Sequence, residues 1–314
     1  MARKTLLFIY NPTAGKGVLK PKLSEVIEEF MKAKYEVTIY ATQREHEATE
    51  LVASKSENYD RIVCSGGDGT MHEVMEGLMQ LPKEKRRPCG YIPAGTVNDF
   101  ANSLVLPGKV EEDARVAVSE HISTYDIGSM NGNYFNYIAA FGAFTSVSYE
   151  TPQSFKNVMG KAAYFLEGLI QLPSIQPYHL IIRGDNGIEI EDDFIFGMVT
   201  NARSVGGFPV FNKTALKLND GVFEGVFVRN PKNPLELQSV VNAFLTKNTN
   251  EQIVAFRSSR FEILCEQEVS YTLDGEDGGN FKEVVIENHK AAVSYANADK
   301  KHSRKTRGKQ VKKE

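Results

Sequence analysis

Residues 61–79, RIVCSGGDGTMHEVMEGLM, are the stretch that decides the fold of this chain. They begin with a short apolar run, Arg61–Ser65, and pass through a glycine-rich loop into Met71–Leu81, where apolar residues recur at helical spacing. A strand that turns into a helix is half of a βαβ unit, and such units build parallel sheets. Ligands of these sheets bind beyond the carboxyl ends of the strands, so the loop in this stretch is a candidate site.

The same alternation of strands and helices extends outward over residues 1–125. Short β-forming runs predict strands at Thr5–Tyr10, Tyr35–Tyr40 and Cys89–Ile92. Between them, Leu23–Lys32 and Arg44–Ser54 have the spacing or composition of helices. We therefore predict a Rossmann-like α/β domain over residues 1–125.

The pattern changes near residue 123, where short strands separated by Gly, Asn and Asp turns become frequent. Two helical stretches, Met159–Leu172 and Pro234–Leu245, interrupt them. We predict a mostly antiparallel β-sandwich over residues 126–287, and a strand or helix within residues 288–299 (Ala291–Ala298) that returns to the first domain. The predicted strands are Tyr134–Phe141, His179–Arg183, Ile188–Asn201, Leu216–Leu218, Val222–Arg229, Ile253–Ser258, Arg260–Glu266, Glu268–Leu273 and Val284–Ile286.

Charge is unevenly distributed along the 314 residues. The sequence has 37 Lys and Arg against 40 Asp and Glu, a net charge of −3. Residues 300–314 hold eight of the basic residues and one acidic residue, so this tail carries +7 and the body −10. An acidic body argues against a nucleic-acid binder that works through its folded surface. The tail is low in complexity, and we predict that it is disordered.

The remaining composition is that of a globular protein, with 41% hydrophobic and 25% charged residues. The three cysteines, Cys64, Cys89 and Cys265, are far apart in apolar stretches, which predicts buried, reduced thiols. No apolar run approaches the length of a membrane span. We therefore expect a cytoplasmic protein.

The loop Ser65–Thr70 has the features of a phosphate cradle. Its three glycines let the backbone turn sharply and approach a ligand, and the N–H groups of the helix that follows attract anions. Glycine content alone is equally compatible with an ordinary turn. Asp68 would repel phosphate unless it holds a cation or accepts a proton from the substrate.

Two further loops fall at the same predicted edge of the sheet. Asn11–Gly17 follows the first strand; it is not a P-loop, but it is glycine-rich and its Lys16 could reach a phosphate. Pro93–Ala101 follows the fourth strand, where Thr96 could contact a nucleotide and Asn98-Asp99 could cap a helix. Turn chemistry alone does not easily explain why three such loops converge.

Two acidic turns stand out in the second half, Leu218–Gly221 and Leu273–Gly279. Asp-Gly pairs favour hairpins, but the second turn has more carboxylates than a hairpin needs. A base that deprotonates a hydroxyl must be a positioned carboxylate or His, and Asp274 or Glu276 qualifies. The His and Cys residues show no metal-ligand spacing, so a zinc site is not expected.

Taken together, Asn11-Pro12-x-x-Gly15, Gly66-Gly67-Asp68-Gly69-Thr70 and Pro93-Ala94-Gly95-Thr96-x-Asn98-Asp99-Phe100-Ala101 form one set. The set resembles the diacylglycerol-kinase catalytic domain family, and the acidic turns fall where the second domain of that family has them. GGDGT alone also occurs in NAD kinases and phosphofructokinases, whereas its combination with PAGTxNDFA is specific to lipid kinases. Up to about residue 298 the chain resembles a soluble bacterial diacylglycerol kinase of the Gram-positive type.

The resemblance implies an α/β domain like that of NAD kinases and phosphofructokinases, a β-sandwich domain, and ATP in the cleft between them. It implies that phosphate passes from ATP, with Mg²⁺, to the hydroxyl of diacylglycerol to give phosphatidic acid. The ATP-binding residues expected from the resemblance and from loop chemistry are Asn11, Pro12, Thr13, Ala14, Gly15, Lys16, Thr42, Gly66, Gly67, Asp68, Gly69, Thr70, Glu73 and Thr96.

The resemblance also implies metal and catalytic residues. A structural Mg²⁺ would be held by Asp220 and by the carbonyls of Lys217 and Val222. Asp99 and Asp126 would belong to a network of carboxylates, water and Mg²⁺. The implied catalytic residues are Asp68, near the transferred phosphate and its Mg²⁺, and either Glu276 or Asp274 as the base.

The chain departs from the family pattern at His72, where Asn is usual, and at 206–211, where a longer glycine run near the lipid entrance is shortened. One alternative is a kinase of the same fold acting on another lipid alcohol or on NAD, although Asn98–Ala101 lacks the glycine-containing motif of NAD kinases. Another is a catalytically idle lipid-binding protein. The presence of Asp68, Asp220 and the Asp274/Glu276 pair argues against it.

The expected partners are therefore ATP, membrane diacylglycerol and, through residues 300–314, anionic lipid at the inner face of the membrane. The alternative for residues 300–314 is a solvated end without such a role. A homodimer is compatible with the sequence, and a nucleic-acid partner is not expected.

Overall fold

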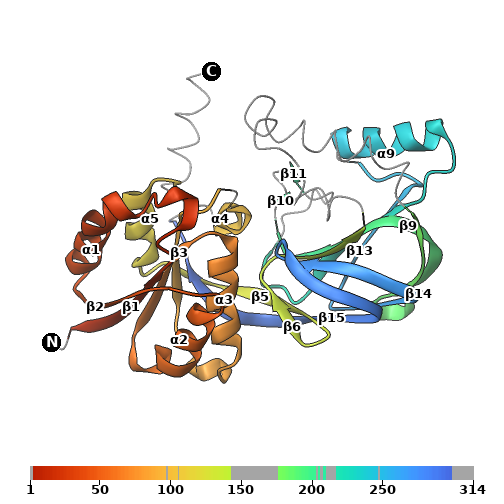
Figure 1. Ribbon diagram of the computed structural model, residues 1–314. Helices are drawn as coiled ribbons and strands as arrows, with labels where there is room; N and C mark the ends of the chain where they lie inside the picture. Colours follow the sequence, from red (N-terminus) through yellow and green to blue (C-terminus); the bar gives the residue numbers. More distant parts are fainter. Residues whose placement is uncertain are drawn as a thin grey trace, which may run out of the picture. The chain divides into compact units, whose positions relative to one another are not determined.

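A computed structural model describes residues 3–96, 98–104, 106–142, 176–202, 204–205, 208–209, 217–246 and 248–298 (Figure 1). The chain divides into two compact units, Met1–Tyr125 with the C-terminal part from Ala291, and Asp126–Lys290. The helix predicted at Met159–Leu172 and the predicted basic tail, 300–314, lie outside the described residues.

The first unit is built on a parallel sheet with the strand order β15-β4-β3-β1-β2. β1 and β3 occupy the centre and are almost continuously apolar, because both of their faces are covered by helices. The end of β15 closes the sheet beside β4, with Tyr295 opposite Cys89. The strands are β1 (Lys4–Tyr10), β2 (Tyr35–Ala41), β3 (Arg61–Gly66), β4 (Cys89–Pro93) and β15 (Glu276–Ala296).

Helices cover both faces of this sheet (Figure 1). α1 packs against α5 and β2 on one face, while α2 packs against α3 on the other. The helices are α1 (Leu23–Lys32), α2 (Glu47–Lys55), α3 (Asp68–Met79), α4 (Asp99–Leu104) and α5 (Val110–Ala117). Short 3₁₀ turns stand at Ala14–Lys16, Lys20–Lys22, Ser56–Asn58 and Lys83–Lys85. The predicted α/β class of the first half is confirmed.

Two helices begin elsewhere than the sequence pattern predicts. α2 begins at Glu47 rather than Arg44, because His46 takes a left-handed φ of 60°. α3 begins at Asp68 rather than Met71: Gly67 is extended, and its carbonyl already accepts the Met71 N–H at 3.1 Å. Part of the glycine loop is therefore the first turn of a helix.

The second unit is an antiparallel sheet with the order β13-β12-β9-β7-β14-β15, extended by β5 and β6 beside β15. β8 pairs with both β9 and β14, so it shares with β7 the place between them. The strands are β5 (Ile122–Met130), β6 (Asn133–Phe135), β7 (Ile138–Gly142), β8 (Tyr178–Arg183), β9 (Glu189–Thr200), β12 (Phe223–Arg229), β13 (Ile253–Ser258) and β14 (Arg260–Leu273). A separate pair, β10 (Ser204–Val205) and β11 (Phe208–Pro209), a 3₁₀ turn at Asp185–Gly187 and helix α9 (Pro234–Thr246) complete the elements.

An aromatic core joins strands that lie far apart in this sheet. The ring of Phe135 on β6 lies 5.7 Å from that of Phe223 on β12, and Phe227 of β12 contacts Phe194 and Phe261. Since β6 and β12 stand near opposite ends of the strand order, the sheet must fold over its own core. The predicted antiparallel, β-rich second half is confirmed.

Several strand predictions in the second half are wrong in detail. Tyr134–Phe141 is interrupted at residues 136–137, and the described part of Leu216–Leu218 is a turn. Arg260–Leu273 is one strand rather than two, with an irregularity in its pairing after Leu264. Val284–Ile286 is the middle of the 21-residue strand β15, which also includes most of the returning segment.

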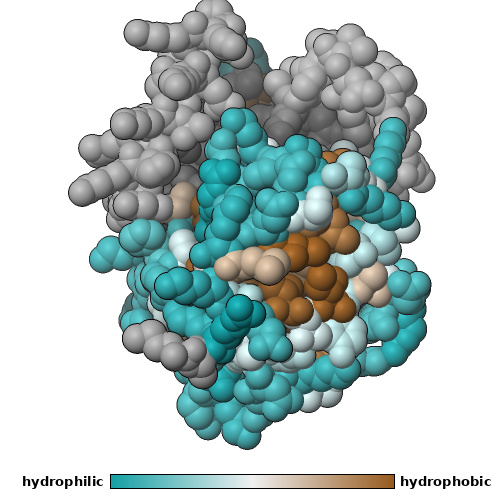
Figure 2. Space-filling view, turned by 90° about the vertical axis from the view of Figure 1, so that its left-hand side faces the viewer, coloured by the Kyte–Doolittle hydropathy of each residue, from teal (hydrophilic) through white to brown (hydrophobic). Residues whose placement is uncertain are grey.

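The described surface carries few exposed large apolar side chains. Figure 2 shows the side of the molecule at the left of Figure 1, where an apolar patch is framed by hydrophilic residues. Among the described residues the large apolar side chains that are most exposed are Val18, Met31, Ile39 and Leu235. No helix in the described ranges combines the length and apolar character needed to cross a bilayer.

All three cysteines are free thiols, as predicted, but only two of them are buried. Cys265 is half-buried. Burial raises the pKa of the Cys89 thiol to about 12, and that of Cys64 well above its ordinary value. Neither buried thiol is a nucleophile at neutral pH.

Candidate functional site

The three predicted phosphate loops meet at the carboxyl edge of β1, β3 and β4. Asn11 N–H donates to the Ser65 carbonyl at 2.9 Å, and Ala94 N–H donates to the Gly66 carbonyl at 2.8 Å. These bonds tie the residue after β1 and the residue after β4 to the end of β3. The parallel sheet thus assembles, within one unit, residues that are up to 83 positions apart.

Gly15 allows the first and third loops to touch. Its φ is +54°, and a Cβ built there would lie 1.9 Å from the carbonyl oxygen of Ala94. Any side chain would therefore push the two loops apart. Asn11 shapes the same loop by accepting the backbone N–H and the hydroxyl of Thr13, at 2.9 and 2.8 Å. Lys16 is exposed at the end of this loop.

The start of α3 brings a carboxylate to this edge. Gly67 precedes the helix, and no side chain of the described residues caps it. Asp68 is the first helical residue, and its Oδ1 accepts the N–H of Phe100 at 3.3 Å. The second glycine loop and the start of α4 are therefore in contact through the predicted catalytic aspartate.

Asn98 fixes the shape of the third loop. Its side chain accepts the Gly95 N–H at 2.9 Å and donates to the Gly95 carbonyl at 2.7 Å, while its own φ is +54°. The Asn98 carbonyl accepts the N–H of Ala101, so the backbone of Asn98 begins α4, in line with the prediction of a helix cap here. The side chain of Asn98 instead closes the turn before the helix. Thr96 is exposed at the tip of this turn, and the side chain of Asp99 lies outside what the structure describes.

Thr42 and Glu73 lie beside these loops in different ways. Thr42 N–H donates to the Tyr10 carbonyl at 3.0 Å, which places Thr42 directly after β2 at the same edge. Glu73 accepts the N–H of Ala48 at 3.1 Å, so its carboxylate is used at the start of α2. A contact between Glu73 and ATP stays a prediction.

In the second unit, Asp126 holds the loop that was predicted to bind a structural metal. It is fully buried, its N–H donates to the Leu218 carbonyl at 2.8 Å, and its Oδ2 accepts the Gly221 N–H at 2.7 Å. Asn288 donates to the same oxygen at 3.3 Å. Asp126 thus contacts the 217–222 loop directly, through N–H groups of the protein. Its part in a network with water and Mg²⁺ stays a prediction.

Asp220, the predicted metal carboxylate, has a partner that the sequence pattern did not indicate. Its Oδ2 lies 2.6 Å from Nη2 of Arg257, and Nε of the same arginine lies 3.0 Å from Glu224 Oε1. Glu224 is only 4% exposed, and burial raises its pKa to about 7. Among the described residues, no group of three or more His, Cys, Asp or Glu is arranged to hold a metal.

Asp274 and Glu276, the two candidates for the base, differ sharply in surroundings. Asp274 is buried, and its carboxylate accepts the backbone N–H groups of Asn136, Tyr137 and Ile138 at 2.6, 2.9 and 3.2 Å. Asn136 and Tyr137 form the break between β6 and β7, and Ile138 begins β7, which explains the interrupted strand. Glu276 is exposed at the first position of β15, beyond the Asp274-Gly275 turn.

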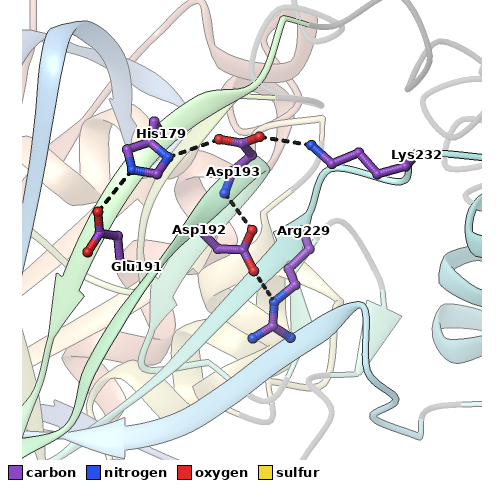
Figure 3. A network of polar contacts seen from close by, with 6 residues as sticks. All are labelled: His179, Glu191, Asp192, Asp193, Arg229 and Lys232. Carbon is purple, nitrogen blue, oxygen red and sulfur yellow. Dashed lines mark hydrogen bonds and ion pairs between the residues drawn. The ribbon is translucent and has the colours of Figure 1, made fainter.

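A further polar network lies on the surface of β8 and β9 (Figure 3). His179 bridges Glu191 and Asp193 at 3.1 and 3.0 Å, and Asp193 also binds Lys232 at 2.8 Å. The hydrogen bond to Asp193 raises the pKa of His179. The network contains no residue predicted for the site.

Known proteins match the chain over most of its length. A family model described as the diacylglycerol kinase catalytic domain matches residues 5–130. The diacylglycerol kinase of Staphylococcus haemolyticus is 35% identical over 280 residues, 88% of this chain and 83% of the relative. That of Bacillus subtilis is 33% identical over 279 residues, with 88% and 91% covered.

Solved structures give the same result for the fold. A putative diacylglycerol kinase from Bacillus anthracis matches with a TM-score of 0.81 at 26% identity, covering 95% of this chain and 98% of that one. An NAD kinase from Archaeoglobus fulgidus matches with a TM-score of 0.51 at 16% identity, over 97% and 98% of the two chains. The latter likeness concerns the fold alone.

Proposed function

The chain belongs to the diacylglycerol kinase family, and on that premise we propose that it transfers the γ-phosphoryl group of ATP, with Mg²⁺, to the hydroxyl of diacylglycerol. The products are phosphatidic acid and ADP. One observation carries the proposal: three glycine-containing loops meet at one sheet edge, with Asp68 at the start of α3 among them. Membership of this family shows that the chain is an enzyme and a lipid kinase. The identity of its two substrates is what we propose.

The loop edge suits a nucleotide because it offers backbone N–H groups at close range. Gly67, directly before α3, has no side chain to keep a ligand from the backbone, and helix N-termini favour phosphate. Lys16 adds a positive charge beside them. Phosphoryl transfer requires mainly positioning and charge neutralisation, which these groups supply.

Mg²⁺ fits the first unit at Asp68. A carboxylate beside bound phosphates repels them unless a cation lies between the two, and Mg²⁺ is usually bound by one or two carboxylates together with substrate phosphates. When bound, the ion would neutralise charge on the transferred phosphoryl group. Asp68 would hold it, with the Phe100 N–H fixing the orientation of its carboxylate.

Glu276 is the better candidate for the base. Both carboxylate oxygens of Asp274 already accept backbone N–H groups, so neither oxygen is free to approach a substrate hydroxyl. Glu276 is exposed and two residues away. In the proposed step the lipid hydroxyl oxygen bonds to the γ-phosphorus, the bond to the ADP oxygen breaks, and the hydroxyl proton moves to Glu276.

Asp274 then acts as a positioning residue. Its carboxylate and its own N–H, which donates to the Ile138 carbonyl at 2.9 Å, fasten the hairpin tip to the β6–β7 break. Asp274 has a φ of +52° and Gly275 one of +92°, as expected for a tight Asp-Gly hairpin turn. The turn presents Glu276 at its end.

The assay that tests the proposal offers the protein labelled ATP and Mg²⁺ with diacylglycerol in mixed micelles, with other lipid alcohols, and with NAD. We expect labelled phosphatidic acid as the main product. Labelled NADP without labelled lipid would contradict the proposal. A preferred lipid other than diacylglycerol would favour the alternative, a kinase of the same family with another lipid substrate.

Variants test the two proposed roles separately. Glu276→Gln should lower kcat by at least about 100-fold, since positioned acid–base groups contribute about 10²–10⁴-fold. Asp68→Asn should also lower kcat, because the Mg²⁺ that neutralises charge on the transferred phosphoryl group would lose its carboxylate. Glu283→Gln, an exposed glutamate on the same strand β15, is the matched control and should keep the wild-type rate. If Glu276→Gln also kept that rate, the base would have to be sought elsewhere.

A further inference from the structure

We propose that Arg257 supplies the positive charge at the 217–222 loop that a structural Mg²⁺ would otherwise supply. The guanidinium joins two carboxylates, Asp220 in the loop and Glu224 on β12, the strand that directly follows the loop. Neither the kinase reaction nor its substrate is needed for this inference. It concerns how the chain stabilises a loop that Asp126 also holds.

The position of Arg257 is set by the pairing of two strands. Arg257 on β13 stands directly opposite Glu224 on β12 in the antiparallel register. From there, its Nε reaches Glu224 Oε1 at 3.0 Å and its Nη2 reaches Asp220 Oδ2 at 2.6 Å. The two bonds use different edges of the planar guanidinium, an arrangement that an ammonium group could not reproduce.

Burial makes the arginine necessary for Glu224. The residue is 4% exposed, and its Oε2 has no hydrogen-bond partner among the described residues. A buried carboxylate with an unpaired oxygen lowers the stability of the fold. Arg257 is the only ion-pair partner of Glu224 among the described residues, so removing Arg257 would leave a buried charge uncompensated. Arg257, whose own side chain is 40% exposed, therefore acts as the counter-ion of a buried carboxylate.

The same contacts leave little for a magnesium ion to bind. Mg²⁺ requires near-octahedral oxygen ligands and usually keeps several waters. The loop offers one carboxylate, Asp220, whose Oδ2 is bound to Arg257 and whose Oδ1 faces the Val222 N–H at 3.4 Å. A divalent ion at Asp220 would also face the guanidinium as a like charge.

Melting of the full chain without nucleotide, in EDTA and in millimolar Mg²⁺, tests the inference. The wild type should show no rise in melting temperature in Mg²⁺ that the substitution Asp220→Asn removes. Arg257→Gln should melt about 5 °C lower in EDTA, because a buried carboxylate loses its counter-ion. It should regain part of that loss in Mg²⁺, since Asp220 and Glu224 are then available to the ion.

Arg260→Gln is the matched control. Arg260 also contacts two carboxylates, Glu262 and Glu287, at 2.7 and 2.8 Å, but that cluster is exposed. This variant should melt within about 1 °C of the wild type, with no response to Mg²⁺. If Arg257→Gln did not fold, Arg257→Lys would replace it. Arg257→Lys should melt at a lower temperature than both the wild type and Arg260→Gln, without a Mg²⁺ response.

Two results would overturn the inference. One is a wild-type melting temperature that rises in Mg²⁺ and loses this rise in Asp220→Asn, which would place a magnesium ion at the loop. The other is an Arg257→Gln variant, or Arg257→Lys in its place, that is no less stable than Arg260→Gln. A rise in Mg²⁺ that persists in Asp220→Asn reports binding elsewhere and supports the assignment.

Discussion

At the scale of single residues, chemically similar carboxylates take different roles because of what surrounds them. Asp274 and Glu276 are two positions apart, yet one is enclosed by backbone N–H groups and the other is exposed. The sequence identifies the pair as candidates because two acids flank a turn glycine. It does not separate them, since the N–H donors come from residues about 137 positions away.

Asp274→Asn should therefore affect stability more than Glu276→Gln does. We expect a loss of about 1–3 kcal/mol in unfolding free energy, because the amide cannot accept at both ends and leaves buried N–H groups unpaired. Urea unfolding of both variants measures this difference. Equal stabilities would show that the carboxylate does not hold the β6–β7 break.

Asp113 should make stability depend on pH. It is 1% exposed, and burial raises the pKa of its carboxyl to about 6. Its folded pKa thus lies above the unfolded value, so the unfolded state binds fewer protons between about pH 4 and 6, and stability falls as pH rises through that window. In sequence it looks like an ordinary acid in the first turn of a helix.

Asp113→Asn should remove this dependence. Since Asn retains an oxygen for the Gly108 N–H, which donates to Asp113 at 3.0 Å, we expect a gain of about 2 kcal/mol at pH 8 and almost none at pH 4. Denaturant unfolding at both pH values provides the measurement. Glu112→Gln, next to it and half-buried, is the control and should show a much smaller difference.

At the scale of elements, the glycine loops could be predicted and the cross-strand contacts could not. Short apolar runs ending in glycine reveal both the strands and the loops at their carboxyl ends, because chain order fixes that geometry in a parallel sheet. The pairing of Glu224 with Arg257 depends on antiparallel register, to which the sequence gives no local signal. The start of α3 was missed because Gly67-Asp68-Gly69 looks like a loop.

Gly15→Ala tests how closely two of these loops must approach. The added Cβ would clash with the Ala94 carbonyl, whereas Gly17, with a φ of +77°, has its nearest atom 3.5 Å away. Gly15→Ala and its control, Gly17→Ala, both suffer the strain of a left-handed residue, roughly 1 kcal/mol. We expect Gly15→Ala alone to weaken ATP binding by at least about tenfold, measured by titration calorimetry. Equal affinities would mean that the loops separate without harm to the site.

At the scale of the whole molecule, charge is divided between body and tail. Residues 300–314 carry +7 against −10 for residues 1–299. A lipid kinase must reach a bilayer, and we propose that the tail attracts the protein to anionic lipid, at roughly 1 kcal/mol per basic residue near the surface.

Deleting residues 300–314 should weaken binding to anionic vesicles at low salt and leave turnover on micellar substrate unchanged. Salt should reduce the difference, because screening shortens the range of the attraction. Vesicle sedimentation over a salt series measures this. Vesicle binding that does not change on deletion would remove the tail from the proposal.

The discontinuity of the first unit has a consequence for protein synthesis. Its sheet includes Tyr295 beside β4, yet the 165 residues of the second unit are translated between Tyr125 and Ala291. At a translation rate of about 5–20 residues per second, the edge of β4 stays unpaired for on the order of 10–30 s, until the end of β15 has been synthesised. An unpaired strand edge is prone to aggregation during that time. Yield of this protein in a cell should therefore respond to translation speed and to chaperones that cover nascent chains.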